Sequence, residues 1–150
     1  MSNPIQKLIR SINPLIELAD TWLKPALLAA VRIHVALVFW RSGMTKIADW
    51  DITVALFTDE YHVPLLPPAV AAVMGACGEL GLSPLLMLGL AGRFAAAGLF
   101  VVNLVAATSY PGLTEAGLTQ HFYWGMLLAI LAVCGTGKLS LDTLVVKRFG

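Results

Sequence analysis

The sequence predicts an all-α integral membrane protein, a four-helix bundle with an N-terminal interfacial amphipathic segment. Of the 150 residues, 58% are hydrophobic and only 13% are charged, and the mean hydropathy is +0.80. A soluble domain carries roughly 25% charged residues, and a chain of this length could not hide so much apolar surface from water. The length allows one bundle domain at residues 25–150, preceded by the segment of residues 1–24.

The hydrophobic residues gather in four segments that approach the roughly 20 apolar residues needed to cross a bilayer core. Prolines open the first two segments, where a helix tolerates them in its first turn. Glycine-containing turns follow the third and the fourth. The fourth segment is the shortest, and its start is expected nearer Thr119. The predicted spans are residues 25–47, 67–90, 92–109 and 121–133.

Two further segments lie outside the spans. Residues 3–22 mix apolar and charged side chains in a pattern typical of a helix in the membrane interface, with an interruption expected at Pro14. A disordered tail is the alternative for this segment. Residues 49–68 form the longest polar connection, expected as a periplasmic loop of the kind that carries functional residues.

The basic residues predict the orientation of the spans. Seven of them flank the side of the two termini, and only Lys46 flanks the other side. Both termini are therefore expected in the cytoplasm, with the spans in a bacterial inner membrane. The seven basic residues on the side of the termini are Lys7, Arg10, Lys24, Arg93, Lys138, Lys147 and Arg148.

The formal net charge of the chain is +1, which argues against a nucleic-acid partner.

Polar residues within the spans are the candidate site residues, because ionisable groups in a membrane cost roughly 2.5–3.5 kcal/mol each. Glu79 lies near the middle of the second span, where its side chain cannot reach the headgroups. It would take up a proton or pair with a cation, and Arg32 is the expected partner. Such a pair either fixes the helix register or forms a proton or quinone-headgroup site. Asn103 is expected to form hydrogen bonds between helices.

Helical spacing sorts the first span into two stripes on roughly opposite faces. One stripe contains Gly43, which permits close helix contact, and it is expected to face the bundle. The other would face lipid, a second subunit or a cofactor. The first stripe is Arg32, Ala36, Phe39, Gly43 and Lys46, and the second is His34, Val38, Arg41 and Thr45.

Histidines and cysteines indicate no metal or redox centre. His34 and His121 are expected at different depths, which disfavours a shared haem. The histidines and carboxylates expected at the periplasmic side match no compact ligand motif. His121 is expected in an aromatic belt at the membrane boundary. Cys77 and Cys134 form no CxxC pair and are expected as small buried apolar residues.

Several short motifs together resemble the DoxX family over about residues 25–144. These are Arg32, Phe39, Ser42-Gly43 and Lys46, then Glu79-Leu80-Gly81, Leu88-Gly89-Leu90 and Arg93, and finally Gly135-Thr136-Gly137-Lys138-Leu139-Ser140-Leu141-Asp142. Residues 61–68 and 98–103 are similar to a proteobacterial subgroup encoded beside small secreted metal-stress peptides. The resemblance implies a four-helix inner-membrane protein linked to redox chemistry. Without the paired cysteines of a membrane thiol oxidase, a disulfide relay is not expected.

Three functions are compatible with these features. The first is a redox-associated subunit that binds a quinone-like or other small ligand in the bundle. If it takes part in catalysis, it would be a subunit of an oxidoreductase. Arg32, Glu79 and Asn103 would line the site, with Lys46 and Arg93 at its two mouths. The second is a membrane anchor or assembly partner for a soluble or periplasmic redox or metal-stress protein, docked through the loop at residues 49–68 and the cytoplasmic ends. The third is a transport helper for a small solute or metal, acting as a homo-oligomer.

Overall fold

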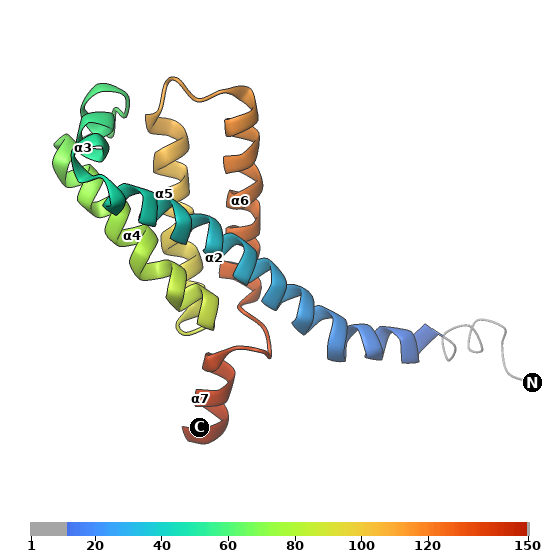
Figure 1. Ribbon diagram of the computed structural model, residues 1–150. Coiled ribbons are helices and arrows are strands. Elements are labelled where there is room, and N and C mark those ends of the chain that lie inside the picture. The colour runs from blue at the N-terminus through green and yellow to red at the C-terminus, as the bar shows by residue number, and fades with distance from the viewer. Residues whose placement is uncertain (1–11, 150) are drawn as a thin grey trace, which may run out of the picture.

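The computed structural model describes residues 12–149, which form helices and no strand, so the all-α fold is confirmed (Figure 1). One continuous helix, Ile12–Ala48, opens the described chain and includes a π-helical turn, η1. The elements are η1 (Ala19–Leu23), α2 (Lys24–Ala48), α3 (Trp50–Asp59), α4 (Pro68–Leu88), α5 (Gly92–Ser109), α6 (Glu115–Cys134) and α7 (Leu141–Phe149).

Four of these helices are long and apolar enough to cross a membrane, as the hydropathy predicts. They are Ile12–Ala48, α4, α5 and α6. The fourth begins at Glu115 and is longer than expected, because the Thr114 side chain accepts a hydrogen bond from the Gly117 N–H at 3.1 Å and caps the helix.

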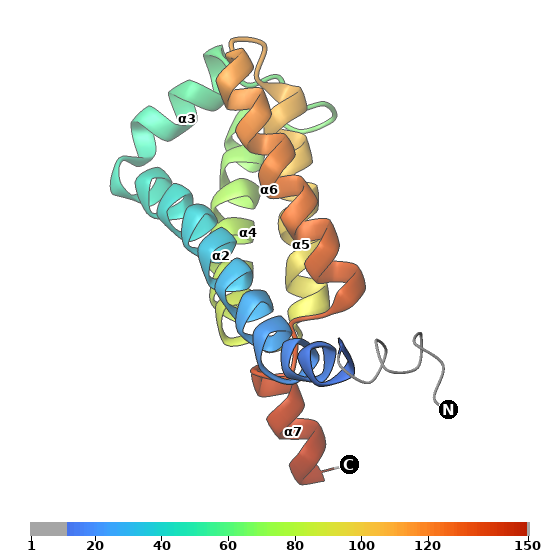
Figure 2. The ribbon, with the colours of Figure 1, turned by 90° about the vertical axis from the view of Figure 1, so that its right-hand side faces the viewer.

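The helices pack so that α2 crosses α4 obliquely, while α5 lies between α4 and α6 (Figure 1). Figure 2 shows that α2 ends well below the level reached by the far ends of α4, α5 and α6, and that α3 rises over the remaining height. We call the end with α3 and residues 110–114 the loop end. The opposite end, with residues 89–91 and 135–140, is called the terminal end, because α7, the last described helix, lies there (Figure 2).

The expected interruption at Pro14 is wrong for the described part of the N-terminal segment. The chain is helical from Ile12 onward, so Pro14 lies within the described helix and does not interrupt it. The helix projects away from the bundle (Figure 1), and Leu15 and Trp22 are exposed. An interfacial location stays a prediction, and its part at residues 3–11 lies outside the described residues.

The expected loop at residues 49–68 is also partly wrong, because half of it is α3. The Asp49 side chain accepts a hydrogen bond from the Ile52 N–H at 3.0 Å and starts this helix. Phe57 of α3 then packs on Ala71 and Ala72 of α4. The connection is therefore folded against the bundle.

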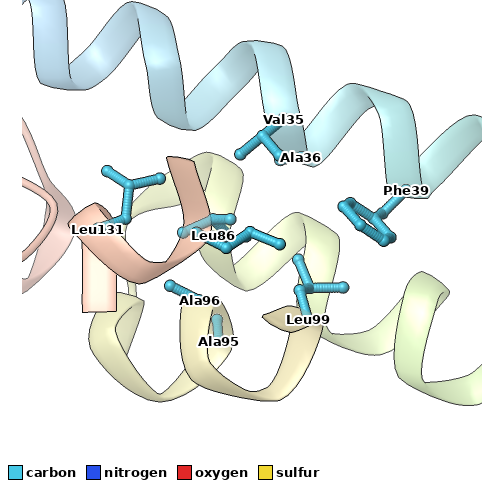
Figure 3. Close-up of a cluster of buried hydrophobic side chains, with 9 residues drawn as sticks. Val35, Ala36, Phe39, Leu86, Ala95, Ala96, Leu99 and Leu131 are labelled. Atoms are coloured by element: carbon cyan, nitrogen blue, oxygen red, sulfur yellow. The ribbon is translucent and has the colours of Figure 1, made fainter. Parts of the chain in front are cut away.

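The core confirms the assignment of the two stripes on α2 (Figure 3). Val35, Ala36 and Phe39 point inward, and Gly43 is buried. On the opposite face, His34 and Arg41 are exposed. The remaining core residues, from α4, α5 and α6, are Leu86, Ala95, Ala96, Leu99, Leu128 and Leu131. The expected burial of the two cysteines is wrong, because Cys77 and Cys134 are both free and exposed.

Candidate functional site

The buried carboxylate Glu79 pairs with Lys46, and the expected pairing with Arg32 is wrong. The Lys46 ammonium donates to Glu79 Oε2 at 2.8 Å and to Oε1 at 2.9 Å. Ser42 joins both groups: its hydroxyl accepts from Lys46 at 2.9 Å and donates to Glu79 Oε1 at 3.1 Å. The Glu79 side chain is 6% exposed and that of Lys46 is 18% exposed, so the pair is largely removed from solvent.

The register between α2 and α4 explains this choice of partner. A Cβ on Gly43 would lie 2.7 Å from Leu80 Cγ and 3.1 Å from Glu79 Cβ, so Gly43 is the point of closest approach. Lys46 lies one turn beyond this contact and reaches Glu79. Because α2 ends at Ala48 below the far ends of its neighbours (Figure 2), its last turn is level with the middle of α4.

Arg32 instead holds the terminal end together. Its guanidinium donates to the carbonyl oxygen of Thr136 at 3.1 Å and to that of Leu139 at 2.6 Å. Gly89, with φ +67°, lies directly against it, and a Cβ at Gly89 would overlap the guanidinium. Arg32 thus supplies hydrogen bonds to carbonyls of the non-helical segment after α6, which is a structural role.

The C-terminal motif lies at this same end. The Asp142 carboxylate accepts from the N–H groups of Ala91 at 2.8 Å and Gly92 at 3.0 Å, and so caps the start of α5. Arg93 is exposed and lies beside Gly135. Neither Arg32 nor Arg93 approaches Glu79, so two of the five expected site residues belong to a different part of the bundle.

Asn103 links α5 to α6, as its position within the span predicts. Its amide nitrogen donates to the carbonyl oxygen of His121 at 2.9 Å, and its amide oxygen lies 2.9 Å from His121 Nδ1. Since the amide oxygen can only accept, Nδ1 carries the proton. His121 also packs edge-on against Trp124. This pair borders a second, apolar groove of about 330 Å³ between α5 and α6, away from Glu79.

A cavity of about 290 Å³ adjoins the Lys46–Glu79 pair between α3, α4 and α5. Its walls are mostly apolar, and its polar members are the ion pair, Tyr61 and residues near the end of α5. One of these, Ser109, is 3% exposed, and its hydroxyl has no hydrogen-bond partner among the described residues. The lining is Lys46, Phe57, Tyr61, Val63, Pro64, Leu66, Ala71, Met74, Gly75, Glu79, Val101, Val102, Val105, Ala106, Thr108 and Ser109.

Three aromatic rings stack at the loop end, and two of them, Phe57 and Tyr61, line the cavity. Tyr61 stacks between Phe57, at 4.8 Å between ring centroids, and Tyr110, at 4.9 Å. Burial, with the nearby charges of Glu79 and Glu60, raises the pKa of Tyr61. A hydrogen bond with Glu60 raises the pKa of Tyr110. Both phenols therefore stay protonated and uncharged around neutral pH.

Sequence reasoning missed Ser42, Ser109 and the aromatic wall. Ser42 could have been predicted, because it lies four residues before Lys46 and therefore next to it on one helix face. Ser109 is adjacent to Glu79 only through the fold. Among residues 12–149, no group of three or more His, Cys, Asp or Glu side chains is placed to hold a metal ion.

Comparison with known proteins gives one match. A DoxX family model matches residues 27–112, which is more than half of the chain and includes both members of the Lys46–Glu79 pair. The C-terminal Gly135–Asp142 motif lies beyond the matched residues. No curated protein and no solved structure matches the chain. The matched region and the four apolar helices show that the chain is a membrane protein that belongs to the DoxX family.

Proposed function

We propose that this protein binds the head group of a quinone-like ligand in the cavity beside Lys46 and Glu79, as a redox-associated membrane subunit. The observation that carries the proposal is a buried ion pair that lines a cavity with apolar walls. Burying two charges is rarely favourable for stability alone. A site with apolar walls and a few placed polar groups is the usual form of a small-molecule pocket.

The size of the cavity supports a head group rather than a whole lipid. Ligand pockets enclose about 300–1,000 Å³, and this cavity of about 290 Å³ lies at the lower limit. Met74, Val101 and Val105 line it and are exposed on the outer surface of the bundle. In a membrane these side chains would face lipid, so a ligand could leave its apolar tail among the acyl chains while its ring occupies the cavity.

Of the expected site residues, Glu79 and Lys46 take part in this proposal. Arg32 and Asn103 form hydrogen bonds elsewhere in the bundle, and Arg93 is exposed at the terminal end. We further propose that the terminal end faces the cytoplasm of a bacterial inner membrane. The support is the clustering of basic residues there, including Arg93, Lys138 and Lys147, which is typical of cytoplasmic loops. A docked redox or metal-stress partner and a transport role stay predictions.

A cavity-filling variant tests the proposal. Gly75 lines the cavity, and a Cβ there would lie 3.6 Å from Phe57 Cζ, so Gly75→Leu directs its side chain into the space. Gly81→Leu is the matched control, because it makes the same change on α4 where no atom lies within 4 Å. Each protein is purified in mild detergent, extracted with organic solvent, and its quinone content measured by mass spectrometry.

We expect quinone to co-purify with the wild-type chain and with Gly81→Leu, and to be reduced at least fivefold in Gly75→Leu. The reason is that a filled cavity excludes the ring but leaves the outer surface unchanged. Equal quinone in the two variants would mean that the bound quinone lies elsewhere. A wild-type quinone content no higher than that of an unrelated membrane protein from the same cells would refute the proposed function.

A further inference from the structure

The buried ion pair leaves one kind of hydrogen-bonding capacity unused. An ammonium group has three donors and no acceptor. The Lys46 ammonium makes three contacts, at 2.9 Å to Glu79 Oε1, 2.8 Å to Oε2 and 2.9 Å to Ser42 Oγ. Its donors are therefore all used within the protein. Lys46 has no proton to offer to a ligand carbonyl.

Glu79, in contrast, can still accept. Each carboxylate oxygen accepts about two hydrogen bonds. Oε1 receives one from Lys46 and one from Ser42, whereas Oε2 receives only the one from Lys46. The free capacity at this end of the cavity is thus an acceptor on a side chain that is 6% exposed. A ligand satisfies it with an N–H or O–H group.

A further polar group of the cavity is the Ser109 hydroxyl, which is buried and without a partner among the described residues. A hydroxyl both donates and accepts, so Ser109 can pair with either a ligand hydroxyl or a ligand carbonyl. Leaving such a group buried and unpaired costs about 1–3 kcal/mol, which a bound ligand would remove.

The packing of α4 on α5 indicates how far apart Glu79 and Ser109 lie along the helices. Gly78 lies against Val102 and Gly98 against Leu82, an antiparallel register that places Ser109 level with Ala71. Ala71 and Glu79 are eight residues apart, which is about 12 Å along a helix. Along this axis, two hydrogen bonds of about 2.8 Å each leave roughly 6 Å between the ligand's polar atoms. This is the reach of two oxygens at opposite positions of one ring.

Resting on the proposed function, we infer that the cavity selects the reduced, dihydroxy form of a single-ring quinone over its oxidised, dicarbonyl form. One hydroxyl donates to Glu79 Oε2 and the opposite one pairs with Ser109. The oxidised ring has only acceptors, so its carbonyl would face the Glu79 carboxylate with no hydrogen between them. A hydrogen bond to a charged group, when lost, corresponds to about tenfold or more in affinity.

The test compares three probes that share one ring and differ in donors: duroquinol, duroquinone and the dimethyl ether of duroquinol. Binding to the full chain in lipid nanodiscs is measured anaerobically by equilibrium dialysis, with empty nanodiscs to subtract partition into lipid. We expect duroquinol to bind at least tenfold more tightly than duroquinone and than the ether. Duroquinone binding as tightly as duroquinol would overturn the selectivity and leave the proposed function standing. No binding of any probe above empty nanodiscs would overturn both.

Two serine variants separate ligand contact from folding. Ser109→Ala removes the unpaired hydroxyl at the cavity, and Ser83→Ala removes another buried and unpaired hydroxyl that does not line it. Both are expected to leave thermal stability unchanged or raised, since neither hydroxyl has a protein partner. Only Ser109→Ala is expected to weaken duroquinol binding, by about fivefold or more. Equal duroquinol affinity in the two variants would overturn the assignment of Ser109.

Discussion

Replacing Lys46 with methionine should destabilise the protein more than any change to an exposed cation on the same helix. The substitution keeps an unbranched side chain and removes the charge. It leaves the Glu79 carboxylate, 6% exposed, with Ser42 as its remaining hydrogen-bond donor among the described residues.

The magnitude follows from burial. Removing one partner of a buried ion pair costs about 3–5 kcal/mol, because an uncompensated charge is left behind. Lys46 keeps 18% of its side chain exposed, which places the expected cost near the lower limit, at about 3 kcal/mol. The double variant Lys46→Met/Glu79→Gln removes both charges and should recover most of this loss, with an interaction free energy of about 2 kcal/mol.

Reversible unfolding with sodium dodecyl sulfate in lipid–detergent micelles, followed by tryptophan fluorescence, measures these free energies. Arg41→Met is the matched control, since Arg41 is exposed on α2, and it should change the free energy of unfolding by less than about 0.5 kcal/mol. The reasoning is refuted if Lys46→Met costs no more than Arg41→Met. It is also refuted if the double variant is as unstable as the sum of its two single variants.

Three further outcomes can be checked by the same unfolding assay. Gly43→Ala should lower the free energy of unfolding by about 1–3 kcal/mol, because its Cβ would lie 2.7 Å from Leu80 Cγ. Gly81→Ala, whose Cβ would have no atom within 4 Å, should be neutral or slightly stabilising. Equal effects of the two substitutions would contradict the close contact at Gly43. Arg32→Met should cost about 2–4 kcal/mol by leaving two carbonyl oxygens unpaired, without changing ligand affinity, and a selective loss of binding would speak against its structural role. Asp142→Ala should cost about 1–2 kcal/mol through loss of the cap on α5, and hydrogen exchange should be faster at the first turn of that helix if the cap acts as described.

The spans and the inward stripe of α2 could be predicted because both depend on local properties of the chain. Hydrophobic length determines which segments can cross a bilayer. A period of 3.6 residues brings Ala36, Phe39 and Gly43 to one face in any helix of this sequence. The extra helix α3 also had a local signal in the Asp49 cap, but the β-branched run Ile52-Thr53-Val54 that follows is a weak helix former.

The partner of Glu79 could not be predicted in this way. Depth estimated from the ends of predicted spans favoured Arg32, but depth depends on where each helix ends and how it is tilted. The chain by itself determined that a carboxylate would be buried in the bundle and that Lys46 shares a helix face with Arg32. Only the tertiary structure decided the pairing, because the close contact at Gly43 sets the register of α2 on α4. The same register between helices brings Ser109, thirty residues along the chain, to the cavity beside Glu79.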